Sequence, residues 1–226
     1  MPDLAPKAEL LRSLGRLVRG LSALFWGLPL SLLVCVRTAM SEWLRPLGML
    51  PPVLATGLLL YGLLQLGCFQ KQERIWRNAL DRAVLLAIVN IGLAPFIYWW
   101  NRLPGVSYYG LGVAVLVLSS LLFLFNLNYV LQRLAAMLPD ETLRVETTLF
   151  GNLNLYLLCA VLFLVSLYFA LHEISALPII LIQLLQLLEL GRQWLLVFLV
   201  LLPVAMTMTL IWKIKEVILA SVFGED

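Results

Sequence analysis

Long apolar stretches, each of about 17 to 27 residues, constrain this chain more than any other feature of its sequence. A helix rises about 1.5 Å per residue, so about 20 residues cross the roughly 30 Å hydrocarbon core of a bilayer. Only 13% of the residues are charged, against about 25% in an average soluble domain. No stretch shows the polar–apolar alternation of an outer-membrane barrel strand. The sequence therefore predicts an all-α fold, a polytopic transmembrane helical bundle.

Six stretches have the length and composition of transmembrane helices. Residues 174–190 are also apolar, but polar side chains recur in them at every third position from Gln183 to Glu189. We expect this segment to be an interfacial or re-entrant helix, with a seventh span as the alternative. The stretch 20–36 is short and contains Pro29. The predicted spans are 20–36, 49–69, 83–100, 106–132, 149–171 and 194–212.

The N-terminal residues 1–19 are basic and amphipathic. Apolar side chains from Leu10 to Val18 share one helical face, and Arg12, Arg16 and Arg19 share the other. This pattern predicts an interfacial helix whose arginines bind anionic lipid head groups, at about 1 kcal/mol per basic residue. A solvated basic leader is the alternative. The remaining residues, 20–226, are expected to form the transmembrane helical domain.

The basic residues predict the orientation, because Lys and Arg are retained on the cytoplasmic side. With six spans and a cytoplasmic N-terminus, twelve of the sixteen basic residues are inside. If 20–36 did not span, eight basic residues would be inside and eight outside. Both termini are therefore predicted to be cytoplasmic, in a bacterial cytoplasmic (inner) membrane. The outer residues are Arg37, Arg45, Arg102 and Arg192; the inner ones are Lys7, Arg12, Arg16, Arg19, Lys71, Arg74, Arg77, Arg82, Arg133, Arg144, Lys213 and Lys215.

Aromatic residues support the same orientation, since Trp and Tyr favour the two membrane interfaces. Trp212 falls beside Lys213 at a predicted inner end. The inner segment 70–82 is either a positively charged anchor or a short amphipathic helix that packs Ile75, Trp76, Ala79 and Leu80 against an apolar surface. The aromatic residues at predicted outer ends are Trp43, Tyr98, Trp99, Trp100, Tyr108, Tyr109 and Trp194.

Residues that could perform chemistry are scarce. The predicted spans contain no ionisable side chain, which argues against ion-driven transport and voltage sensing. His172 is the only histidine, so a haem held by two histidines of one chain is excluded. The three cysteines are far apart, and no hydrolase or phosphate-binding motif occurs. We expect no enzyme, no catalytic or metal-binding residue and no cofactor, and the net charge of +3 gives no indication of nucleic acid binding.

Small and amide-bearing residues within the spans are the candidates for helix packing. In lipid, such side chains allow close helix approach or form interhelical hydrogen bonds of roughly 0.6 to 2 kcal/mol. Two asparagine pairs are expected at similar depths in a helical hairpin. Pro203 should kink the last span, because it cannot donate a backbone hydrogen bond. The hydroxyl of the nearby Thr207 could donate to the backbone carbonyl that loses its partner. The packing candidates are Ala83, Ala87, Asn90, Ala94, Gly110, Ala114, Asn126, Asn128, Asn152 and Asn154.

These features predict a non-enzymatic integral membrane subunit: a scaffold, assembly or accessory component of a membrane protein complex. Its expected partners are membrane lipids and either further copies of itself or other membrane protein subunits. The alternative is a channel or facilitator for a small neutral solute, lined by the four asparagines and Thr207. A third class, an intramembrane enzyme acting on lipid, would require His172 and Glu173 to face a cleft.

Overall fold

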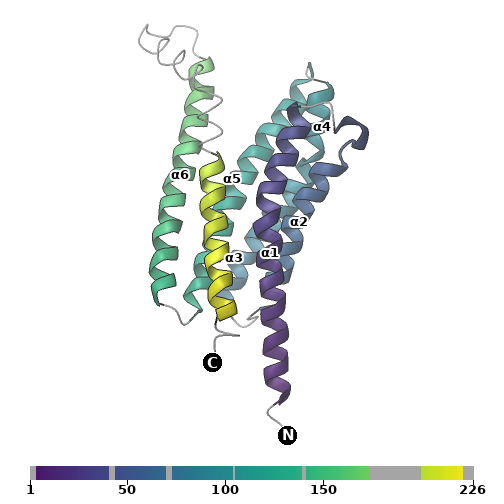
Figure 1. The fold of residues 1–226 in the computed structure, drawn as a ribbon. Coiled ribbons are helices and arrows are strands. Elements are labelled where there is room, and N and C mark those ends of the chain that lie inside the picture. Colours follow the sequence, from purple (N-terminus) through teal and green to yellow (C-terminus); the bar gives the residue numbers. More distant parts are fainter. Residues whose placement is uncertain are drawn as a thin grey trace.

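The computed structural model describes residues 4–40, 44–69, 73–103, 105–138, 141–173 and 200–220, with side chains from Arg12 in the first helix and up to Phe163 in the sixth. These ranges are helical and contain no strand, which confirms the predicted all-α class. A further helix, here named helix 200–220, follows the labelled ones (Figure 1). The labelled elements are α1 (Leu4–Met40), the 3₁₀ turn η1 (Arg45–Leu47), α2 (Leu50–Leu66), α3 (Arg74–Leu93), α4 (Pro95–Arg102), α5 (Ser107–Ala136) and α6 (Glu141–Glu173).

Among the described residues, four helical segments are long and apolar enough to cross a membrane. The helix α2 is equally apolar but has 17 residues, which corresponds to about 25 Å. Helix 200–220 has charged side chains in its second half, at Lys213, Lys215 and Glu216. The predicted segment 174–190 lies outside the described residues. The four candidate spans are Arg12–Met40, Arg74–Arg102, Ser107–Ala136 and Arg144–Phe163.

The helix α1 is continuous through residues 4–40, so no break occurs at residues 19 and 20, where the sequence predicts an interfacial helix to meet the first span. Pro29 lies inside this helix without ending it. Leu17 and Leu21 are both fully buried, one on each side of the predicted boundary. The apolar face of the basic segment therefore packs against the bundle, because it continues the buried face of the span in register.

The helix α3 begins nine residues before the predicted span 83–100, at Arg74. Trp76 is fully buried and Leu80 is 5% exposed, whereas Ile75 is exposed. The inner segment thus forms the first turns of a membrane-length helix. Pro95 lacks the amide hydrogen needed to continue the hydrogen bonds of α3, so α4 begins there as a separate helix, although Ala94 between them keeps an α conformation.

The helices run up and down in a bundle, with α6 at one edge (Figure 1). Helix 200–220 contacts three others. Its Trp212 ring lies 5.8 Å from the ring of Phe25 on α1, and its Lys213 forms an ion pair with Glu146 on α6. The start of α1 and the end of helix 200–220 lie at the same end of the bundle (Figure 1).

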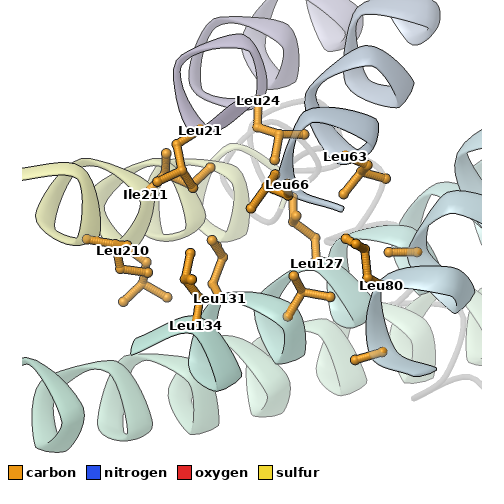
Figure 2. Packing of buried hydrophobic residues seen from close by; sticks show 14 of the residues in the cluster. Leu21, Leu24, Leu63, Leu66, Leu80, Leu127, Leu131, Leu134, Leu210 and Ile211 are labelled. Carbon is orange, nitrogen blue, oxygen red and sulfur yellow. The ribbon is translucent and has the colours of Figure 1, made fainter. Parts of the chain in front are cut away.

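Leucine side chains from α1, α2, α3, α5, α6 and helix 200–220 meet in the core, and Figure 2 shows part of this cluster from close by. In a bilayer, where lipid chains are as apolar as leucine, association of such helices would depend on close packing and on polar contacts more than on removal of apolar surface from water. The labelled core residues are Leu21 and Leu24 of α1, Leu63 and Leu66 of α2, Leu80 of α3, Leu127, Leu131 and Leu134 of α5, and Leu210 and Ile211 of helix 200–220.

Candidate functional site

Three polar side chains from three helices meet inside the bundle, and we name this cluster the polar junction. It consists of Asn128 on α5, Asn154 on α6 and Thr207 on helix 200–220. Asn154 and Thr207 are fully buried and Asn128 is 5% exposed. Each residue lies on a buried and mainly apolar face of its helix, so the packing of the three helices brings the polar groups together.

Hydrogen bonds connect all three members of the polar junction. The Nδ2 atoms of Asn128 and Asn154 both donate to Thr207 Oγ1, each over 3.0 Å. Thr207 Oγ1 lies 2.8 Å from the carbonyl oxygen of Pro203, one turn earlier, and 3.3 Å from Asn128 Oδ1. Asn128 Nδ2 also donates to the carbonyl of Leu124 over 2.8 Å. One hydroxyl therefore joins two helices to a third.

The hydroxyl of Thr207 has its full set of partners. A hydroxyl has one proton to donate and two lone pairs that accept. The two amide groups occupy both lone pairs, and the proton has a close acceptor in the carbonyl of Pro203. Asn154 Oδ1, by contrast, is buried without a partner among the described residues. Amide and hydroxyl groups do not ionise near neutral pH, so the polar junction can orient and hold helices but offers no acid–base chemistry.

The other two predicted asparagines lie away from the polar junction. Asn126 is half-buried, and its Nδ2 donates to the carbonyl of Leu122 on its own helix over 2.9 Å. Asn152 is exposed on α6. Positions two apart on a helix differ by about 200° in direction. One asparagine of each predicted pair therefore faces the polar junction, and the other faces away from it.

The predicted small face of α3 is buried throughout, at Ala83, Ala87, Asn90 and Ala94. Of the second predicted small-residue pair, on α5, Gly110 is half-buried and Ala114 is exposed. The buried positions on that part of α5 are instead Gly112, Leu116, Ser119 and Phe123. An added Cβ at Gly112 would collide with the Phe96 ring. These four positions are spaced four, three and four residues apart, so they lie on one face of α5, which continues to the buried Leu127. Gly112 could have been identified from the sequence by its place on this face.

The helices α1 and α2 lie close together at two glycines, Gly20 and Gly62. A Cβ added to Gly20 would lie 2.8 Å from the carbonyl oxygen of Gly62, and one added to Gly62 would lie 3.0 Å from that of Gly20. Both positions are buried. Neither glycine is among the packing residues predicted from the sequence, although small residues at helix contacts are typical of membrane proteins.

The two ends of the bundle differ in charge and aromatic content. The basic end includes the exposed Arg12, Arg16 and Arg19 of α1 and the starts of α3 and α6 (Figure 1). At the other end, aromatic residues of α4 and α5 pack together. The rings of Trp99 and Tyr109 are stacked, with centroids 6.2 Å apart and planes at 19°.

The aromatic end also contains an open hollow beside α4. Pro46, Tyr98, Asn101 and Arg102 line it. Asn101 Nδ2 donates to the carbonyl of Thr38 over 2.9 Å, which ties α4 to the end of α1. Arg102 Nη1 donates to the hydroxyl of Tyr98 over 2.9 Å. The polar groups of this hollow are thus used in contacts between and within helices.

Side chains that bind metal ions are scattered over the part of the chain that the structure describes. No group of three or more His, Cys, Asp or Glu side chains there could hold a metal ion. The side chains of His172 and Glu173 lie outside the described part.

No protein-family model matches the chain, and no curated protein and no solved structure matches it.

Proposed function

We propose that the chain is a non-enzymatic integral membrane subunit that acts as a scaffold, assembly or accessory component of a membrane protein complex. The polar junction is the observation that supports this proposal. Its three members occupy nearly all of their hydrogen-bonding groups with one another and with the backbone. Polar side chains used in this way hold helices together, and they are not available to a passing solute.

The proposal includes six spans with both termini cytoplasmic, in a bacterial cytoplasmic membrane. The four candidate spans, together with α2 and helix 200–220, would supply them. The gathering of basic side chains at one end and of stacked aromatic rings at the other supports this orientation, because positive residues stay inside and Trp and Tyr favour the interfaces.

A channel or facilitator for a small neutral solute would need a continuous polar path along the asparagines. The described positions give little support to such a path. Asn128 and Asn154 bond to Thr207, Asn126 bonds to its own helix, and Asn152 faces outward. Because these side chains point in different directions, the structure favours the membrane subunit over the channel.

Purification from native membranes in a mild detergent, without crosslinker, tests the proposed function. The particle mass, corrected for bound detergent, should exceed the 25.4 kDa of one chain, either as a multiple of it or with a second protein at fixed stoichiometry. A Thr207→Val variant, which lacks the hydroxyl of the polar junction, is purified in the same way, and its particle mass is compared with that of the unaltered chain. Recovery of the unaltered chain as a lone monomer at every detergent concentration would contradict the proposal.

A further inference from the structure

The exposed side of α6 has a regular arrangement, which we name the α6 stripe: Val145, Leu149, Asn152, Tyr156, Cys159 and Phe163. All six residues are exposed. Their spacings alternate between four and three residues, the heptad spacing by which two helices pack along a seam. Tyr156 is 72% exposed and Val145 is 65% exposed. The stripe therefore points away from the rest of the described chain.

Heptad spacing alone does not indicate a protein partner, as the neighbouring helix shows. The exposed side of α5 has the same spacings, and its members are apolar or aromatic: Tyr108, Leu111, Val115, Leu118, Leu122 and Phe125. Lipid chains can cover such a surface fully. The α6 stripe differs because Asn152 places a primary amide among its apolar residues.

Asn152 lies within the candidate span Arg144–Phe163, six residues after the charged Glu146. Hydrocarbon chains offer no hydrogen-bond partner, so an amide facing them has a cost that a protein partner removes. Asn126 avoids this cost by donating to the carbonyl of Leu122 on its own helix. The side chain of Asn152 has no such partner within the described residues.

We propose that the α6 stripe binds the same stripe of a second copy of this chain, with the two Asn152 amides hydrogen-bonded to each other. An amide has both a donor and an acceptor, so two copies can pair reciprocally about a twofold axis. Copies of one chain insert in the same orientation, so their α6 helices run parallel and equivalent positions face each other. A single asparagine in an apolar seam sets the register of such a pair.

Cys159 provides a direct report on this arrangement. It lies one heptad from Asn152 in the same stripe, so the Cys159 thiols of two paired copies face each other across the seam. A disulfide forms when the two Cα atoms lie about 4.4 to 6.8 Å apart. The inference rests on the proposed function and specifies one of its partners.

The first experiment uses oxidative crosslinking in native membranes. Cys35 and Cys68 are replaced by Ala, and Cys159 remains as the one thiol. Brief oxidation with copper phenanthroline should give a dimer as the main product. The matched control carries Cys159→Ala and Leu122→Cys, which moves the thiol to the exposed side of α5 near the same depth, since Asn128 lies opposite Asn154. Dimer formation should fall at least about fivefold in the control. Equal crosslinking at both positions, or none at Cys159, would overturn the proposal.

The second experiment measures the dimer without crosslinking. Labelled copies are diluted in liposomes of increasing lipid content, and energy transfer reports the dimer fraction. Asn152→Leu should weaken the dimer by about 3- to 30-fold, as expected for loss of interhelical hydrogen bonds, whereas Asn126→Leu should leave it unchanged. Circular dichroism confirms that each variant is helical. An unchanged dimer in Asn152→Leu would refute the role of the amide.

These outcomes separate the inference from the proposed function. If Cys159 fails to crosslink but the chain still purifies with a partner protein or as an oligomer, the α6 stripe is the wrong surface and the subunit proposal stands. If the chain is also a lone monomer in mild detergent, both fail. Lipid alone against the α6 stripe predicts no Cys159 dimer and no effect of Asn152→Leu on association.

Discussion

Replacing Gly20 with Ala should separate α1 from α2, because the added methyl group has no room. An added Cβ would lie 2.8 Å from the carbonyl oxygen of Gly62, 3.0 Å from Gln65 Cβ and 3.2 Å from the backbone nitrogen of Leu66. Two of these three neighbours are backbone atoms of α2. A flexible side chain could move aside, but backbone atoms move only if the whole helix shifts.

The size of this effect follows from two opposing terms. Overpacking of a well-packed contact costs about 1 to 3 kcal/mol, whereas Gly→Ala inside a helix gains up to about 1 kcal/mol in helix propensity. Gly15→Ala on the same helix should gain helix propensity without any overpacking cost, since nothing lies within 4 Å of its added Cβ. The difference between the two variants should therefore equal the overpacking cost, about 1 to 3 kcal/mol.

Equilibrium unfolding provides the assay. The protein in a mild detergent is titrated with a denaturing detergent, and circular dichroism reports the helical fraction. Gly20→Ala should unfold at a lower denaturant fraction than Gly15→Ala. Gly62→Ala should fall between them, because its closest neighbour is the Leu24 side chain, at 2.8 Å. Gly57→Ala, with open space around it, serves as the control on α2.

Equal stability of Gly20→Ala and Gly15→Ala would refute the close glycine contact. A similar loss of stability in Gly57→Ala would show that the assay responds to any added methyl group, and the argument from contact distances would fail.

Three further predictions concern the polar junction, the topology and the basic end. Thr207→Val should lower the free energy of unfolding by about 1 to 3 kcal/mol, because two buried amides lose their acceptor. Thr207→Ser and the outward-facing Thr209→Val should change it little. The same denaturing-detergent titration measures all three variants. Cysteines introduced near Lys71 and Lys213 should be labelled from one side of the membrane and a cysteine at Trp43 from the other, and labelling of the first two from opposite sides would contradict six spans. Replacement of Arg12, Arg16 and Arg19 by Ala should reduce copurified anionic lipid, at about 1 kcal/mol per side chain, whereas Arg102→Ala at the aromatic end should not; equal lipid content in both variants would argue against a head-group site.

The fold class could be predicted because stretches of apolar residues long enough to cross a bilayer leave little other choice. The helices in the structure extend beyond the predicted spans. The sequence separates 1–19 from 20–36 at a change from basic to apolar residues, but α1 continues through it. A change in polarity shows where the environment changes, whereas a helix ends only where the backbone hydrogen bonds end. Gly20 breaks no hydrogen bond, so it marks a close contact and no helix end.

The directions in which side chains face were harder to predict, for a reason specific to membrane helices. In a soluble helix, apolar residues mark the buried face. In α5 the exposed Leu122 and the buried Leu124 are the same residue type, since lipid and core are equally apolar. Only small and polar residues distinguish the buried face from the lipid-facing one. Two nearby glycines such as Gly110 and Gly112 differ by about 200° in direction, so choosing the wrong one selects the wrong face.

The repeated Asn-Leu-Asn sequence shows how one local pattern gives two outcomes. In α5, Asn128 faces the polar junction, and the outward Asn126 bonds to its own helix. In α6, Asn154 faces the polar junction, and the outward Asn152 has no partner among the described residues. The inward amide fixes the rotation of α6 about its own axis, and this rotation determines that Asn152 points outward. A change at Thr207 that lets α6 rotate should therefore also weaken association through the α6 stripe, so the fold of one copy and the pairing of two copies depend on the same hydrogen bonds.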